Sequence, residues 1–170
     1  MVNDALEPSK IVREFDAPRQ LVFDAWTQVK HLTNWMFPIS GCTCEFVSAN
    51  IVEGGESLHK LTMPNGNQMW LLTKYEEVNP PERLVFLQYF SNENGDILAM
   101  PHMPDWPKHM LATLRFEEIS DNRTRLIFLW EPRNATEKEI SVFISTRSDH
   151  GKGWGAGLEQ LERYIVSITS

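Results

Sequence analysis

The chain has 170 residues, 42% of them hydrophobic, and six Trp and nine Phe give it ample material for a core. Its formal net charge of -7 argues against a nucleic-acid partner, because a phosphate-binding surface needs clustered Lys and Arg. We expect a single domain over residues 1–170, with its core at about 9–168.

The sequence contains no candidate membrane span, since no stretch approaches the roughly 20 apolar residues that a bilayer requires. The first ten residues also lack the apolar segment of a signal peptide. We therefore expect a soluble, cytoplasmic protein.

Cys42 and Cys44 are the only cysteines, and their spacing places both side chains on one face of an expected strand. Two ligands are too few for a metal site, and cytosolic disulfides are rare. We predict two reduced thiols that pack as small hydrophobic groups.

The first elements are a strand and two short helices. Residues Ile11–Phe15 have the pattern of a strand, and Asp16 with Pro18 then predicts a helix start with Asp16 as the N-cap. A second short helix is expected over Val29–Trp35, because Pro38 prevents its continuation.

Antiparallel strands are expected in the middle of the chain, where Gly, Pro and Asn clusters separate runs of strand length. In the last run Leu126, Phe128 and Trp130 share one face, which should point inward. The expected strands are 42–51, 56–63, 68–78, 83–90, 109–118 and 123–131.

The segment Ser91–Lys108 breaks this rhythm with three prolines and Gly95. Loops of this length are often lids or binding loops, and an ordered surface excursion is an equal alternative.

A capping box at Thr136 and Glu139 begins the final helical region, which extends to about Ile168. Four glycines between 151 and 157 predict a bend there, or a first helix that ends near His150. An apolar stripe follows at Trp154, Leu158, Leu161 and Ile165. The element order indicates an α+β fold in which a curved antiparallel sheet grips a long C-terminal helix, with an apolar pocket between the two.

The chain resembles the family named after the C-terminal domain of the activator of the heat-shock-protein-90 ATPase, within the START-related (SRPBCC), Bet v 1-like superfamily. The residues that carry the resemblance are F-D-A-P-R-Q-L-V-F-D-A-W-T (15–27), Leu32–Trp35, Gly54-Gly55, P-N-G (64–66), E-E-V-N-P-P-E-R-L-V-F (76–86), F-E-E-I-S-D-N-R-T-R-L (116–126) and G-W-G-A-G-L-E-Q-L (153–161). The resemblance implies a helix-grip fold with a cavity that takes hydrophobic small molecules. The co-chaperone has a separate N-terminal domain, for which we expect no room in this chain.

His59 is a candidate for the cavity wall, because strand alternation puts it on the face opposite Lys60. There it would orient a polar ligand group or act as a general base. A histidine hydrogen-bonded to a neighbour is the alternative.

His150 lies four residues before Trp154 and so on the same helical face, which brings it toward the cavity. Aromatic side chains of the inner surface serve as core and as cavity lining at once in such a fold. The predicted cavity residues are Trp35, His59, Trp70, Phe86, Trp130, Phe143, His150 and Trp154.

The sequence therefore favours a binding protein for a small, largely hydrophobic molecule such as a lipid, without a cofactor. One alternative is a cyclase, dehydratase or hydrolase in which His59 works with Asp or Glu partners, although no convergent catalytic constellation is visible. The other is a stress-related partner of the Hsp90 chaperone, which rests on the family resemblance alone. The oligomeric state is open between a monomer and a symmetric homodimer.

Overall fold

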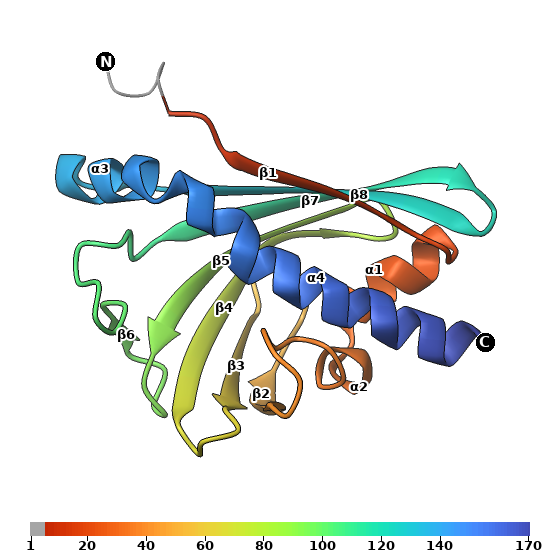
Figure 1. Ribbon diagram of the computed structural model, residues 1–170, viewed down its shortest axis with the longest axis horizontal. Coiled ribbons are helices and arrows are strands. Elements are labelled where there is room, and N and C mark those ends of the chain that lie inside the picture. Colours follow the sequence, from red (N-terminus) through yellow and green to blue (C-terminus); the bar gives the residue numbers. More distant parts are fainter. Residues whose placement is uncertain (1–5) are drawn as a thin grey trace.

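One antiparallel sheet dominates the computed structural model, which describes residues 6–170 (Figure 1). Its strands within these residues follow the order β1-β8-β7-β5-β4-β3-β2, and the short β6 pairs with β5. The strands are β1 (Ser9–Phe15), β2 (Thr43–Ala49), β3 (Glu56–Thr62), β4 (Gln68–Asn79), β5 (Arg83–Ser91), β6 (Ile97–Leu98), β7 (Met110–Ser120) and β8 (Arg123–Pro132).

Four helices accompany the sheet in the described part of the chain: α1 (Arg19–Thr27), α2 (Val29–Leu32), α3 (Glu137–Ser145) and α4 (Arg147–Thr169). Figure 1 shows α4 crossing one face of the sheet, with α1 and α2 beside its C-terminal half. Leu158, Leu161 and Ile165 of α4 are buried against the sheet. The α+β helix-grip prediction is confirmed.

The predicted strands are confirmed to within two residues at every boundary. Leu126, Phe128 and Trp130 of β8 are buried, so this face points inward as predicted. Strand β6, in which Leu98 pairs with Phe90 of β5, lies inside the predicted loop and was missed, because a two-residue strand is too short to give a pattern.

Asp16 is not the N-cap of α1. Pro18 occupies that position, without a side-chain cap, and the Asp16 carboxylate instead forms an ion pair with Arg123. Because α1 begins only at Arg19, Asp16 lies two residues before the N-cap position. The second helix is also shorter than predicted, because the chain continues as a turn after Leu32.

The break in the C-terminal helical region comes at Thr146 and not at the glycines or at His150. The Thr146 hydroxyl donates a 2.7 Å hydrogen bond to the Val142 carbonyl as α3 ends. All four glycines stay helical inside α4 because its apolar stripe is buried against the sheet, and such packing outweighs intrinsic helix propensity.

The predicted capping box is confirmed at the start of α3. The Thr136 hydroxyl accepts a hydrogen bond from the Glu139 N–H at 3.1 Å, and the Glu139 carboxylate accepts one from the Thr136 N–H at 2.9 Å. Thr136→Ala should therefore lower the free energy of unfolding by about 1 kcal/mol, measured by urea denaturation. Thr136→Ser keeps the hydroxyl and should stay close to the parent, and equal losses in the two variants would contradict this role.

Cys42 and Cys44 are free and buried, as predicted. Cys42 Sγ lies 3.4 Å from Met63 Sδ, and burial raises the pKa of the Cys44 thiol to about 12. Both thiols therefore act as packing groups.

Among residues 6–170 the structure has no helix that combines the length and the apolar character needed to cross a membrane.

Candidate functional site

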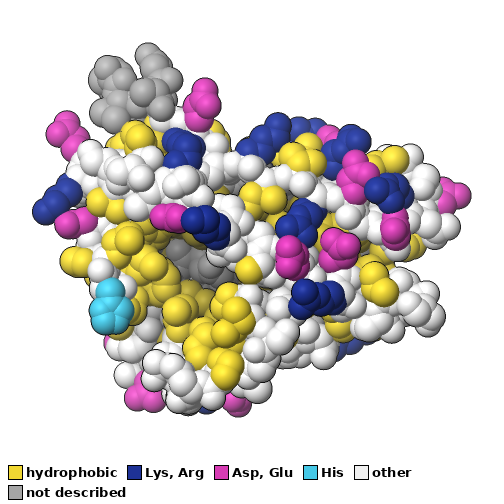
Figure 2. All heavy atoms as spheres, in the orientation of Figure 1, with side chains coloured by type: hydrophobic (Ala, Val, Ile, Leu, Met, Phe, Trp, Pro, Cys, Tyr) yellow, Lys and Arg dark blue, Asp and Glu magenta, His cyan; other side chains and the backbone are white. Residues whose placement is uncertain are grey.

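A cavity of about 370 Å³ lies between the inner face of the sheet and the first half of α4. Figure 2 shows it as a hollow in this face of the molecule, with hydrophobic side chains gathered around it. Its walls come from β3, β4, β5, β7, β8 and α4, from the segment after α2, and from the loop between β5 and β7. The size falls within the usual range of sites for small molecules.

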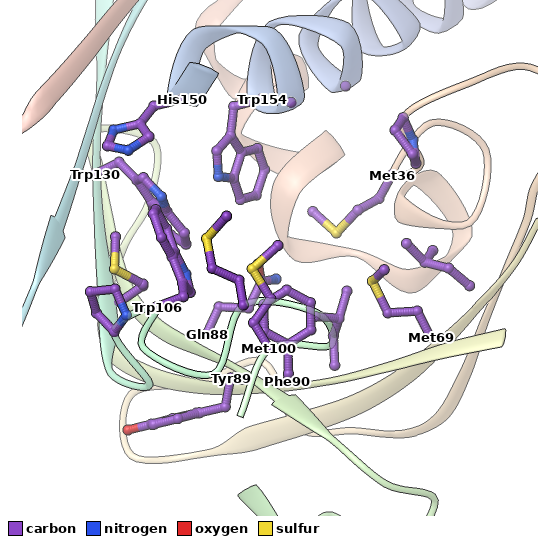
Figure 3. A pocket seen from close by; sticks show the side chains of 18 of the residues that line it. Met36, Met69, Gln88, Tyr89, Phe90, Met100, Trp106, Trp130, His150 and Trp154 are labelled. Atoms are coloured by element: carbon purple, nitrogen blue, oxygen red, sulfur yellow. The ribbon is translucent and has the colours of Figure 1, made fainter. Parts of the chain in front are cut away.

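Most of the wall is apolar, and it is rich in tryptophan and methionine. Figure 3 shows Trp154 reaching from α4 toward Gln88 and Phe90 on the sheet. Four of the six tryptophans of the chain line the cavity: Trp35, Trp106, Trp130 and Trp154. Five of its seven methionines do so as well: Met36, Met69, Met100, Met103 and Met110.

The structure brings five of the eight predicted residues to this wall: Trp35, His59, Trp130, His150 and Trp154. Phe86 lies beside a smaller neighbouring void. Phe143 packs behind the wall, with its ring centroid 6.1 Å from that of Trp106 and 4.4 Å from that of His150.

Trp70 does not line the cavity, so this prediction is wrong. It packs on the outer face of the sheet against the cluster of Leu58, Leu72, Leu87 and Tyr89, and the Lys60 ammonium lies 5.6 Å from its ring centroid. The cation over the ring and the apolar neighbours together give the indole a favourable environment at the surface.

His59 lies on the inner face of β3, as alternation predicted, with 1% of its surface exposed. Its ring stacks on Phe46 at 4.9 Å between centroids. Neither ring nitrogen has a hydrogen-bond partner among the described residues, so the predicted alternative of a neighbour-bonded histidine is wrong. Burial lowers the pKa of His59 to about 4, which keeps the imidazole neutral near pH 7.

His150 differs from His59 because both of its ring nitrogens have partners. The Thr146 hydroxyl donates its proton to the Val142 carbonyl. Its oxygen therefore accepts a hydrogen bond from the N–H at His150 Nε2, at 3.1 Å. Nδ1 then accepts from the Ser9 hydroxyl at 2.5 Å. Burial lowers the pKa of His150, and the positive charge of Arg147 adds to the effect. This side chain ties the start of α4 to β1 and closes one end of the wall.

Charged groups occur only near the mouth of the cavity within the described lining. Asp149 pairs with Lys152 at 3.1 Å between Oδ1 and Nζ, and Lys108 also contributes to the wall. No Asp or Glu of residues 6–170 lines the wall around His59, and these residues form no cluster of three metal-ligating side chains. The arrangement can enclose an apolar molecule and offer it hydrogen bonds from a neutral imidazole.

A family model described as "Activator of Hsp90 ATPase homolog 1-like protein" matches residues 16–166. The chain belongs to this family. A comparison with curated proteins found no match.

Solved structures show the same fold. A protein from Arthrobacter aurescens superposes with a TM-score of 0.76 at 22% identity, covering 93% of this chain and 85% of that one. A protein from Staphylococcus epidermidis gives 0.70 at 23% identity, with coverages of 94% and 91%. A protein from Silicibacter pomeroyi that bears the family name gives 0.71 at 15% identity, with coverages of 95% and 99%.

Several members of the site escaped the sequence reasoning. Gln88 is the one amide in the apolar run of β5. Since Phe86, Gln88 and Phe90 share one strand face, the sequence does indicate that Gln88 points toward the cavity. The methionine and tryptophan side chains of the loop between β5 and β7 gave no such signal, since a loop has no periodicity to show which side chains turn inward.

Two glycines of α4 also shape the cavity. Gly153 and Gly157 line it, and a Cβ added at either position would meet no atom within 4 Å. Gly157 is nevertheless buried, so the space beside it is the cavity. The absence of side chains at these positions therefore contributes directly to the cavity volume.

Proposed function

We propose that this protein binds one small, largely apolar molecule in the cavity between the sheet and α4. The observation that carries the proposal is an open, mainly apolar hollow of about 370 Å³ inside an otherwise well-packed fold. Protein interiors are normally close-packed, and an apolar hollow of this size exposes surface that a ligand would cover. The helix-grip fold of the family is commonly a ligand-binding domain, which supports the same conclusion.

The composition of the wall favours a range of related ligands over one rigid shape. Methionine is unbranched and polarizable, so it adapts to different partners, and tryptophan supplies large flat contacts. Four tryptophans and five methionines supply nine of the 24 lining residues here. We infer that selectivity comes from size and from a few polar contacts.

Titration with the neutral fluorescent probe N-phenyl-1-naphthylamine tests the proposal. Because four tryptophans line the cavity, binding should give saturable energy transfer from Trp to probe with one site per chain. The probe should also raise the unfolding midpoint, since a ligand of the native state stabilises by mass action. Energy transfer that rises without saturation up to the solubility limit, together with an unchanged midpoint, would contradict a defined site.

The enzyme and chaperone-partner hypotheses stay predictions. The wall around His59 offers no carboxylate partner from the described residues, and the family description alone points to the chaperone.

A further inference from the structure

Within residues 6–170, three side-chain nitrogens that line one void in the core lack hydrogen-bond partners: His59 Nδ1, His59 Nε2 and Trp26 Nε1. The other buried nitrogen without a partner in this part of the chain, Arg19 Nε, does not line that void. The His59 and Trp26 side chains are 1% and 2% exposed, so bulk water does not compensate them. Buried polar groups almost always find partners, because an unpaired one carries a large desolvation penalty. Such a concentration of unpaired groups in one place points to a missing partner.

His59 and Trp26 line the same small void, of about 10 Å³, which adjoins the main cavity. This is close to the space that a single water-sized group needs. His59, Met36 and Gln88 belong to the walls of both spaces, and Thr73 adds a hydroxyl-bearing side chain to the smaller one. The void is therefore the polar inner end of an otherwise apolar site.

The hydrogen-bonding capacity of this end defines what it can take. The Trp26 indole offers one donor, and the neutral His59 imidazole offers one donor and one acceptor. No charged side chain lines the void in the part of the chain that the structure describes. A carboxylate or an ammonium group would be buried there without a counter-charge, which is strongly unfavourable.

We propose that His59 and Trp26 form a polar subsite that binds a neutral carbonyl or hydroxyl oxygen at one end of the apolar ligand. This inference rests on the proposed function, because the subsite recognises part of the molecule that the main cavity holds. A carbonyl oxygen accepts from the Trp26 N–H and from the His59 N–H. A hydroxyl group can do the same, or it can accept from the Trp26 N–H and donate to His59 when the other imidazole tautomer turns its unprotonated nitrogen toward the subsite. The subsite thereby selects oxygen-bearing apolar molecules over hydrocarbons.

Four compounds with two phenyl rings test the subsite: diphenylmethane, benzophenone, benzhydrol and diphenylacetate. They share their apolar body and differ at the central carbon, which carries hydrogen, a carbonyl, a hydroxyl or a carboxylate. Displacement of N-phenyl-1-naphthylamine gives the dissociation constant of each compound. We expect benzophenone and benzhydrol to bind about tenfold more tightly than diphenylmethane, and diphenylacetate to bind more weakly than benzophenone.

Equal affinities of benzophenone, benzhydrol and diphenylmethane would overturn the subsite while leaving the cavity function intact. Tighter binding of diphenylacetate than of benzophenone would overturn its neutral character. If none of the four displaces the bound probe, the subsite is overturned while the saturable probe signal upholds the cavity function. If the probe itself does not bind, both proposals fail.

Two variants locate the effect. His59→Leu and Trp26→Phe, which keeps an aromatic ring, should each lose part of the difference in affinity between benzophenone and diphenylmethane. In the parent protein the ¹⁵N resonances of the His59 ring should shift with benzophenone and stay nearly unchanged with diphenylmethane. This NMR measurement uses the parent protein and does not depend on the variants. Unchanged His59 resonances with bound benzophenone would therefore overturn the proposal even if neither variant folds.

Discussion

Gly157→Leu is expected to weaken probe binding about 10- to 100-fold while the fold becomes more stable. The added side chain starts from a buried position where a Cβ meets no atom within 4 Å, so it projects into the cavity. Overpacking by such a group typically costs about 1 to 3 kcal/mol once a ligand occupies the same space, which gives the expected loss of affinity.

The unliganded variant has no such clash, because the leucine fills empty space. Replacing a glycine inside a helix contributes about 1 kcal/mol, which corresponds to a rise of roughly 2–4 °C in the unfolding midpoint of a chain of this length. Differential scanning calorimetry measures this rise, and fluorescence titration measures the affinity. Opposite changes in stability and in binding separate a filled cavity from a damaged fold.

Gly151→Leu is the matched control for this experiment. Gly151 lies in the same helix, has the same open space around its Cβ position and is exposed, and it does not line the cavity. This variant should gain similar stability and keep the affinity of the parent. A Gly157→Leu protein that binds as tightly as the Gly151→Leu protein would show that the probe sits elsewhere.

The helix-grip fold was predictable because its strands alternate and its turns carry Gly, Pro and Asn. The same alternation placed His59 inside and Lys60 outside, as the structure shows. The prediction that Trp70 lines the cavity was wrong because it followed the residue type and not the strand register. Trp70 pairs with Lys60 across β3 and β4, and the neighbours Leu71 and Thr73 show which way β4 faces.

The features that the sequence did not predict depend on tertiary packing, which no local sequence pattern encodes. Helix propensity placed a break at the glycines of α4, yet burial of Leu158 and Leu161 holds them helical and the break falls at Thr146. The unpaired nitrogens of His59 and Trp26 are likewise invisible in the sequence, because the sequence does not show which hydrogen bonds a buried side chain forms. To predict that Met100 and Met103 line the cavity, one would need the path of the long loop between β5 and β7, which the sequence pattern does not give.

Acidification should destabilise this protein through His59, and His59→Leu should remove that part of the loss. Burial lowers the pKa of His59 from 6.5 to about 4 in the folded state, while the unfolded chain keeps the ordinary value. Between these two pH values the unfolded state binds more protons, so stability rises with pH across the window. Above pH 6.5 the imidazole is neutral in both states and costs the fold no stability through protonation. As the pH falls from 6.5 toward 4, the free energy of unfolding decreases.

The expected size of this loss is about 3 kcal/mol, from the difference between the two pKa values. Burial also lowers the pKa values of His31 and His150, and the lowered pKa of Glu14 beside Arg123 adds a further loss in acid. Those groups are present in both proteins. The difference between the parent and His59→Leu therefore isolates the buried imidazole.

Urea denaturation at pH 7.5, 6, 5 and 4, followed by tryptophan fluorescence, measures the effect. At pH 7.5 the variant should be at least as stable as the parent, because leucine removes the desolvation penalty of an imidazole that has no partner in the described residues. Between pH 7.5 and pH 4 the stability of the variant relative to the parent should rise by about 3 kcal/mol. Parallel curves for the two proteins would mean that His59 is charged in the fold or finds a partner on protonation, and an imidazole that readily accepts a proton would be a poor fit for a neutral oxygen subsite.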